Sequence, residues 1–299
     1  MIAAALRILK IYPAFFVSES MLSTELKTQI QGAYSRFLEA KSLKPRYGQR
    51  LMIAEIAKVL GTIRSDDEGK RLGDPAVVAV EAGTGTGKTV AYSLATIPTA
   101  KAAGKRLVIA TATVALQEQI VHKDLPDLLR NSGLNFSFAL AKGRGRYLCL
   151  SKLDHLLQDG AAQSATAQLF EEEGFRIDVD EQGQKLFTTM IEKLAGNKWD
   201  GDRDSWPEEL EDSRWAQLTT DHSQCTNRHC PNFQQCAFYK AREGMGKVDV
   251  IVTNHDMVLA DLALGGGAVL PDPRETIYVF DEGHHLPDKA IGHFAHFTR

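Results

Sequence analysis

The chain has 299 residues, of which 43% are hydrophobic and 24% are charged, and its formal net charge at pH 7 is −3. This composition is typical of a globular protein with one large or two modest domains. The charge excludes a polycation that binds nucleic acid over its whole surface, so any such contact must come from a local basic patch. No apolar run approaches the roughly 20 residues of a membrane span, and we expect no membrane partner.

Residues 1–20 resemble a signal peptide only superficially. Arg7 and Lys10 interrupt the apolar stretch, Pro13 breaks the regular pattern after it, and no convincing cleavage site is present. We expect a poorly ordered tail here. Met21 directly precedes a regular helical pattern and is a candidate for the true start of translation.

Two amphipathic helices are predicted next. Apolar residues recur at helical spacing over residues 21–41, which indicates a packing helix without chemistry. The second helix follows Arg46 and contains Gln49. Because its amide offers both a donor and an acceptor, Gln49 can recognise the N6/N7 edge of adenine if a nucleotide binds nearby.

The segment 77–89 reads VVAVEAGTGTGKT and predicts a buried strand over 77–80, a glycine-rich turn, and a helix that starts near Lys88. This is the context of a phosphate-binding loop. The glycines allow successive N–H groups to point at phosphate oxygens, and the helix adds its positive end. We expect Lys88 to lie along the β and γ phosphates of ATP and Thr89 to bind Mg²⁺. The predicted nucleotide-binding residues of the loop are Ala82, Gly83, Thr84, Gly85, Thr86, Gly87, Lys88 and Thr89.

Apolar strands and helices alternate after the loop. A helix is predicted over 114–121, and strands are predicted over 106–111, 136–140, 248–253 and 276–280. This alternation implies an α/β fold with a parallel sheet covered by helices on both faces. Ligands of such sheets bind at the carboxyl ends of the strands, where the glycine-rich loop is expected.

A second chemical motif, Asp281-Glu282-Gly283-His284-His285, comes directly after the last apolar strand. Paired acids after four apolar positions form a Walker B pattern. We expect Asp281 to hold Mg²⁺ through water, and Glu282 to orient and deprotonate the attacking water. His284 is expected to report the nucleotide state to the rest of the protein.

Residues 142–247 form an insertion, because a crossover between neighbouring strands needs only about a dozen residues. The insertion splits a nucleotide-binding domain into 21–141 and 248–299. Its four cysteines lie near its two ends and are the predicted metal ligands: Cys149, Cys225, Cys230 and Cys236. Four thiolates fit either a structural zinc ion or an iron–sulfur cluster. His222 and His229 could replace Cys149 in a zinc site, although the cysteine spacing lacks the paired knuckles usual for zinc.

A basic stretch free of acids opens the insertion, with a tyrosine among the cations. This combination suits a single-stranded phosphate backbone with a stacked base, and an ordinary surface loop is the alternative. The predicted nucleic-acid contacts are Lys142, Arg144, Arg146 and Tyr147.

Together, RYGQ, AGTGTGKT, GRGRYLC, the cysteine trio, VTNH and DEGHH resemble the DinG branch of the XPD-like helicases in superfamily 2, from about Met21 to the last residue. The resemblance implies a RecA-like ATP-binding domain, with Ala82–Thr89 and Gln49 on ATP and Asp281–His284 as the DEAH box. It implies a [4Fe–4S] cluster on the four cysteines. It also implies ATP-driven 5′ to 3′ movement on single-stranded DNA, forked or hybrid duplexes as partners, and a cytoplasmic role in DNA repair or replication.

Two features depart from that family. Gly283 stands where alanine is usual, which should leave the carboxylates untouched. A second RecA-like domain with its arginine finger is not found in this sequence, so we expect the chain alone not to unwind DNA. A regulator that binds nucleic acid without movement is the alternative function; a small-molecule kinase lacks an obvious acceptor pocket.

Overall fold

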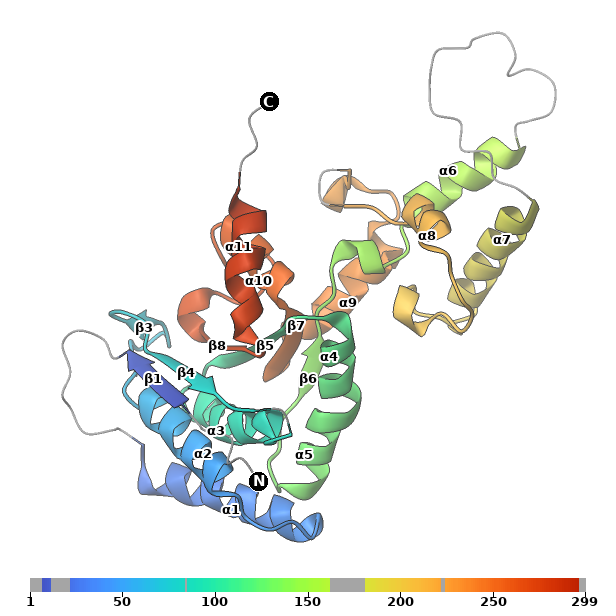
Figure 1. The fold of residues 1–299 in the computed structure, drawn as a ribbon. Helices are drawn as coiled ribbons and strands as arrows, with labels where there is room; N and C mark the ends of the chain where they lie inside the picture. Colours follow the sequence, from blue (N-terminus) through green and yellow to red (C-terminus); the bar gives the residue numbers. More distant parts are fainter. Residues whose placement is uncertain (1–6, 12–21, 84, 162–180, 222–223, 296–299) are drawn as a thin grey trace. The chain divides into compact units, whose positions relative to one another are not determined.

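The structure is a computed structural model that describes residues 7–11, 22–83, 85–161, 181–221 and 224–295. It separates into two compact units (Figure 1). Unit 1 comprises residues 1–141 and 245–299, and unit 2 comprises residues 142–244. Among the described residues, no helix has the length and the apolar character that a membrane crossing requires.

Unit 1 contains a parallel four-stranded sheet with the order β6-β7-β5-β8. Each strand is short and rich in β-branched or other apolar residues, as expected of strands buried on both faces. The strands are β5 (Arg106–Thr111), β6 (Phe138–Leu140), β7 (Val250–Asn254) and β8 (Thr276–Phe280). The predicted α/β fold with a parallel sheet is confirmed and is consistent with a RecA-like domain.

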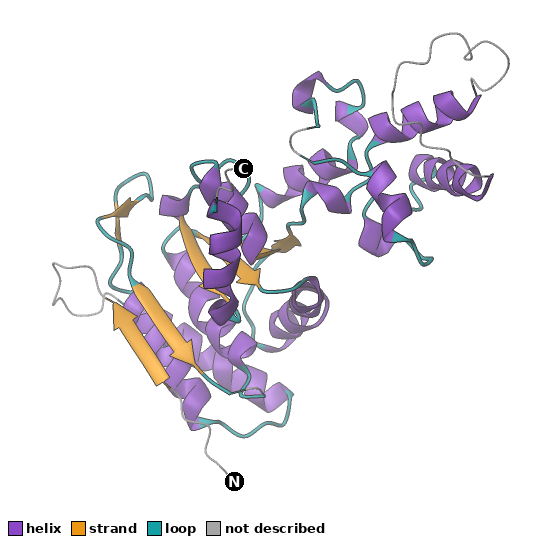
Figure 2. Ribbon diagram, turned by 45° about the horizontal axis from the view of Figure 1, so that its top comes forward, coloured by secondary structure: helices purple, strands orange, loops and turns teal. Residues whose placement is uncertain are grey.

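Helices cover both faces of this sheet, as Figure 2 shows. Alternate residues of β5 divide between the faces: Leu107 and Ile109 belong to one apolar cluster, and Val108 and Ala110 to another. The first cluster is covered by α1 (Thr24–Ala40), α2 (Tyr47–Leu60), α3 (Lys88–Ala102) and α5 (Leu125–Asn131). The second is covered by α10 (His255–Ala263) and the segment 269–270.

The helix predicted over 114–121 ends earlier than expected. It comprises α4 (Val114–Gln119), and a π-helical turn (Ile120–Asp124) connects it to α5. Thr113 caps α4 by accepting a hydrogen bond from the backbone N–H of Leu116. The last helix of the unit is α11 (Leu286–Phe294).

The strand that precedes the glycine-rich loop differs from our expectation. β4 (Val77–Glu81) pairs with β1 (Arg7–Ile11) in an antiparallel ribbon and is not hydrogen-bonded to the four-stranded sheet. It alternates between exposed and half-buried residues, so it is not the fully buried strand that its apolar letters predict. Residues 7–11, expected in a poorly ordered tail, thus form a strand. A second ribbon joins β2 (Arg64–Ser65) to β3 (Arg71–Leu72).

Unit 2 is mainly helical and has its own apolar core. Its helices are α6 (Leu150–Ala161), α7 (Glu181–Ala195), α8 (Asp212–Leu218) and α9 (Ala237–Met245), whose last residue belongs to unit 1. Three tryptophans anchor the core, with Trp199 packed edge-on against Trp206 and Trp215 buried nearby. A smaller cluster of Tyr147, Ala237 and Phe238 lies beside the cysteines.

Candidate nucleotide-binding site and cysteine pocket

The glycine-rich loop leads from β4 into α3, as its sequence predicts. Gly85 and Gly87 adopt left-handed backbone angles, with φ of 72° and 77°. Gly87 is also the N-cap of α3, and it has no side chain to accept hydrogen bonds from the first-turn amides, in contrast to Ser23 at the start of α1. The helix therefore begins with N–H groups suited to an anion. Thr84 lies outside the described residues.

Gln49 contacts the loop directly. Its Nε2 donates to the carbonyl oxygen of Gly87 at 3.3 Å, and its Oε1 accepts from the hydroxyl of Tyr34 at 3.2 Å. A Cβ atom at Gly87 would lie 2.1 Å from Nε2, so a larger residue there would displace the Gln49 amide and would be strained by the left-handed φ. Arg46 holds the loop from the same helix start, because its guanidinium donates to Gly85 O at 2.8 Å. Both ends of the Gln49 amide are thus used within the protein.

Lys88 and the acidic motif meet although they are distant in the sequence. The Nζ of Lys88 lies 2.7 Å from Oε1 of Glu282, and both side chains are about one quarter to one third exposed. The hydrogen bond from Lys88 lowers the pKa of Glu282 below its usual value. Glu282 itself has a left-handed φ of 53°, which is strained for a residue with a side chain. The site therefore places a cation and an anion where α3 begins and β8 ends.

Asp281 is fixed from several directions. Its Oδ2 accepts from the hydroxyl of Tyr92 at 3.3 Å, and its Oδ1 accepts from the backbone N–H of Glu282 at 3.1 Å. Its own N–H donates to Ala110 O at 2.8 Å and so continues the β5–β8 pairing. Burial, and then the neighbouring Glu282, raise the pKa of Asp281. A cation placed here would offset both effects.

Two histidines differ in their surroundings. His255 is fully buried at the start of α10, and its Nε2 lies 2.9 Å from the carbonyl oxygen of Asp281. Burial lowers the pKa of His255, which favours the neutral ring as donor to that carbonyl. His284 is largely exposed, and its Nδ1 lies 3.5 Å from Glu282 Oε2. A Cβ at Gly283 would meet only Phe280 Cβ, at 3.8 Å, so alanine would fit there as well.

Three contributors to this site were not predicted from the sequence: Tyr34, Tyr92 and His255. Tyr34 lies in a helix whose apolar spacing indicates packing, whereas nothing in the sequence singles out Tyr92. Both rings pack in the core. Their second role, in the site, is shown only by the hydrogen bonds of their hydroxyl groups, from Tyr34 to Gln49 and from Tyr92 to Asp281. The histidine of VTNH could have been noticed as a buried polar residue directly after an apolar strand.

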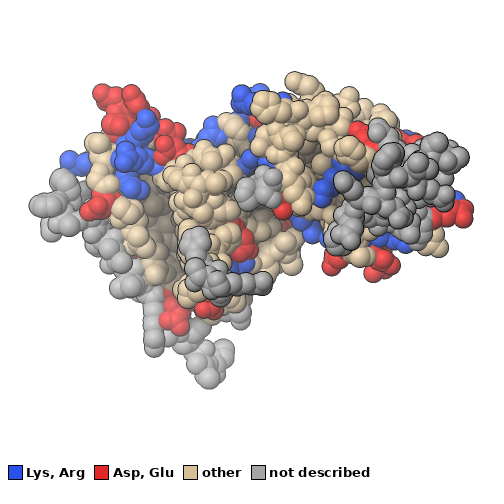
Figure 3. Space-filling model, turned by 90° about the horizontal axis from the view of Figure 1, so that it is seen from above, with Lys and Arg blue, Asp and Glu red and all other residues tan. Residues whose placement is uncertain are grey.

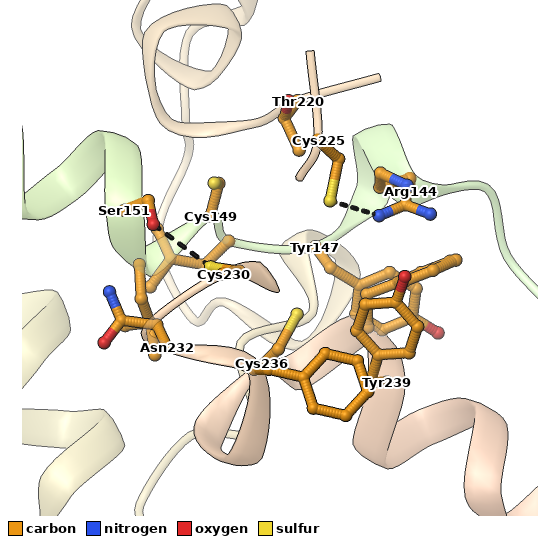
Figure 4. Close-up of a pocket in the computed structure, with 14 residues that line it drawn as sticks. Arg144, Tyr147, Cys149, Ser151, Thr220, Cys225, Cys230, Asn232, Cys236 and Tyr239 are labelled. Atoms are coloured by element: carbon orange, nitrogen blue, oxygen red, sulfur yellow. Dashed lines mark hydrogen bonds between the residues drawn. The ribbon is translucent and has the colours of Figure 1, made fainter. Parts of the chain in front are cut away.

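In unit 2 the four cysteines line one pocket, together with Arg144, Ser151, Asn232 and aromatic side chains (Figure 4). Cys149 directly precedes α6, whereas the other three lie in a loop with two short 3-10 turns, Asn227–His229 and Phe233–Gln235. All four are free thiols of intermediate burial. Burial raises the pKa of Cys149.

Hydrogen-bond donors surround these sulfur atoms. Arg144 Nη1 lies 2.6 Å from Cys225 Sγ, and Ser151 Oγ lies 3.2 Å from Cys230 Sγ, as the dashed lines of Figure 4 mark. The backbone N–H of Asn227 donates to Cys225 Sγ at 3.4 Å. Within the described ranges, no group of three or more Cys, His, Asp or Glu side chains is arranged to hold a metal ion. His229 is not among the pocket-lining residues, and His222 lies outside the described residues.

The basic stretch at the start of unit 2 is used inside the protein, which differs from our expectation of a nucleic-acid surface. The Nζ of Lys142 is bound by Asp202 and Asp204 at 2.7 Å each, and its side chain is only 7% exposed. Arg146 also pairs with Asp204. Asp202 and Asp204, about sixty positions later in the chain, thus neutralise basic side chains that have no acidic neighbour in the sequence.

The aromatic part of that stretch is likewise occupied. Tyr147 is 7% exposed and packs edge-on against Phe238, so its ring does not offer a face to a base. The guanidinium of Arg144 lies over the Phe238 ring, 4.3 Å from its centre. On the face drawn in Figure 3, basic and acidic side chains are interspersed. Lys142 and Tyr147 are thus buried and paired within the protein. DNA contact by these two residues stays a prediction.

The parallel α/β sheet and the Lys88–Glu282 contact beside Asp281 are consistent with a RecA-like domain. In agreement, residues 68–158 match the family model of the DEAD/DEAH box helicases. The chain is, more specifically, a homologue of the ATP-dependent DNA helicase DinG.

Its similarity to DinG extends over most of the chain. It is 42% identical over 271 residues to DinG of Photobacterium profundum, and 39% identical over 270 residues to DinG of Escherichia coli K12. DinG of Salmonella typhimurium LT2 is 38% identical over 270 residues. These alignments cover 90% of this chain but only 36% to 37% of the relatives. The chain thus spans a little over one third of the length of the curated relatives it matches.

Proposed function

We propose that unit 1 is the ATP-binding motor domain of a DNA helicase. The observation that carries this proposal is the 2.7 Å contact of Lys88 with Glu282, directly beside Asp281 and at the start of α3. The arrangement brings a lysine ammonium, a carboxylate able to activate water, and a carboxylate able to hold Mg²⁺ to one place. These are the kinds of group that promote cleavage of a γ phosphate.

Each side chain has a defined role in this proposal. The triphosphate binds the amides of residues 82–89 and draws Lys88 away from Glu282. The Thr89 hydroxyl and the Asp281 carboxylate would hold Mg²⁺, which would offset the negative charge of the phosphates. Glu282, released from Lys88, accepts a proton from the attacking water. Gln49 recognises adenine, for which its amide must exchange the Gly87 or Tyr34 contact for the base.

We further propose that unit 2 holds a [4Fe–4S] cluster on Cys149, Cys225, Cys230 and Cys236. The four thiols surround one pocket, which is the donor set of such a cluster. A single zinc ion would require every sulfur to lie about 2.3 Å from one point. When bound, the cluster links the start of α6 to the distant cysteine loop and supplies a redox-active group.

Helicase activity is proposed for a longer protein of which this chain is a part. Its relatives are named ATP-dependent DNA helicases. For a protein that contains this chain together with a second motor domain, we propose ATP-driven 5′ to 3′ movement on single-stranded DNA, in repair or replication. Arg144 and Arg146, which are half-buried, are the remaining candidates of the basic stretch for DNA contact. Strand displacement from forks with a 5′ or a 3′ tail tests the direction. A protein that binds DNA without displacing a strand would favour the regulator instead.

Binding of a fluorescent, slowly hydrolysed ATP analogue tests the motor site on this chain alone. Lys88→Ala should weaken binding by at least about tenfold, because a charged contact to phosphate is lost. Lys101→Ala is the matched control, since Lys101 lies at the other end of α3 and pairs with Asp249. Equal binding by the Lys88→Ala variant and the unaltered chain would refute the site.

A further inference from the structure

Tyr92 connects the two side chains to which the proposed function assigns Mg²⁺. It lies on α3, one helical turn beyond Lys88 and Thr89, and is 4% exposed. Its hydroxyl donates to Asp281 Oδ2 at 3.3 Å and lies close to the Thr89 side chain. A single phenol therefore bridges the start of the first helix after the loop and the end of β8.

We propose that Tyr92 is a positioning residue for the magnesium ion, which orients the Asp281 carboxylate and the Thr89 hydroxyl toward a common point. This inference rests on the proposed ATP-binding function. A phenol has one proton and two lone pairs, so it can donate to Asp281 while it accepts from Thr89. When the Thr89 proton points at Tyr92, the lone pairs of the threonine oxygen face away and can bind a cation.

The surroundings of Asp281 limit its rotation in the same way. Oδ1 is held by the Glu282 N–H at 3.1 Å and Oδ2 by Tyr92, so each carboxylate oxygen has one fixed donor. A carboxylate oxygen accepts more than one hydrogen bond, which leaves capacity on both atoms for the ion or its water. Without Tyr92, Oδ2 would lose its orienting donor and the carboxylate could turn.

A purely structural role for Tyr92 would not require these partners. Its ring is buried in the cluster that covers one face of the sheet, and packing alone would be served by phenylalanine. The hydroxyl instead ends on Asp281 and Thr89, the two predicted magnesium ligands. Tyr92→Phe consequently separates positioning from packing, because it keeps the ring and removes the hydroxyl.

The test measures binding of a fluorescent ATP analogue to this chain, first in excess EDTA and then as Mg²⁺ is added. In Tyr92→Phe the midpoint of the Mg²⁺ titration should rise about tenfold, the effect expected for loss of a hydrogen bond to a charged group. Affinity in EDTA should stay unchanged, because the phosphate-binding amides and Lys88 are intact. Asp281→Asn should raise the midpoint as well, and the two effects should not be additive.

Tyr278→Phe is the matched control, since it removes a phenol from β8 whose ring packs in the cluster on the opposite face of the sheet. Its midpoint should equal that of the unaltered chain. The affinity in EDTA and the Mg²⁺ midpoint are measured on the same sample. A partly unfolded Tyr92→Phe variant would therefore lose binding in both, and that result would count against a positioning role. An unchanged midpoint in Tyr92→Phe overturns this inference alone, provided that the unaltered chain shows Mg²⁺-dependent binding. If the unaltered chain binds no analogue, or binds it without regard to Mg²⁺, the proposed function fails and this inference fails with it.

Discussion

Lys88 and Glu282 form an ion pair at 2.7 Å although 194 positions separate them in the sequence. The pair closes the site between the glycine-rich loop and the end of β8. When a nucleotide binds, its phosphates must replace Glu282 as the partner of Lys88. Breaking the ion pair is therefore part of the free-energy cost of nucleotide binding. The same contact keeps the proposed base ionised, since it lowers the pKa of Glu282.

Replacing Glu282 with glutamine should therefore have two opposite effects. Affinity for an ATP analogue should rise by a few fold, because Lys88 is freed and a negative charge next to the γ phosphate is removed. DNA-stimulated ATP hydrolysis by a protein with both motor domains should be abolished, because the amide cannot accept the proton. Equilibrium binding and phosphate release measure the two quantities. Normal turnover in Glu282→Gln would remove this residue from the role of base.

Gly87→Ala should abolish analogue binding and destabilise unit 1. The new Cβ would lie 2.1 Å from Gln49 Nε2, in addition to a left-handed φ of 77°. Gly85→Ala is the control, because φ is 72° there but nothing lies within 4 Å of the added atom, and it should cost only about 1–2 kcal/mol of backbone strain. Thermal unfolding compares the two variants. Adding Gln49→Ala should restore part of the loss in Gly87→Ala only, and equal behaviour of both glycine variants would show that Gln49 does not press on the loop.

Cys225→Ser should remove the brown colour expected of the chain when it is prepared without oxygen. The cluster needs all four thiolates, and serine is a poor ligand for iron in this role. Iron and sulfide analysis with visible absorption measures the loss. A colourless unaltered protein that contains zinc instead would overturn the cluster and favour a structural zinc site.

Arg144→Gln should make the proposed cluster easier to extract. Arg144 donates to Cys225 Sγ and is fixed in place by the Phe238 ring, so its removal takes a positive charge and a donor from a thiolate. We expect the visible absorption to decay several-fold faster in the presence of an iron chelator, which corresponds to about 1 kcal/mol. Arg228→Gln, at an exposed position in the same cysteine loop, should decay at the original rate. Identical decay in the two variants would exclude a role for Arg144.

The buried His255 predicts a stability change with pH. Because burial lowers its pKa in the folded state, the folded form binds fewer protons than the unfolded form, whose value is near 6.5. Stability should therefore be full above pH 6.5 and decline as the pH falls below it. Thermal unfolding between about pH 5 and 8 measures this, and His255→Gln should flatten the decline. A decline of the same steepness in the variant would assign it to other groups.

The sequence alone determined the features that are local to one stretch of backbone. The glycine-rich turn before α3 and the acids after β8 could be predicted because strand, turn and helix signals are contiguous. The gathering of four cysteines around one pocket was expected from their positions at the two ends of an insertion. Such patterns survive in the sequence because the chemistry of each depends on neighbours along the chain.

Tertiary structure alone decided which distant side chains meet. Lys142 and Tyr147 read as an accessible basic and aromatic surface, but Asp202, Asp204 and Phe238 bury and pair them. Tyr92 is not singled out by the sequence, and only the approach of β8 to α3 shows that its hydroxyl reaches Asp281. β4 reads as a buried strand, but it pairs with β1 instead of the parallel sheet. Periodicity reports which face of an element is apolar, whereas the partner of a polar atom depends on packing between elements that no local pattern encodes.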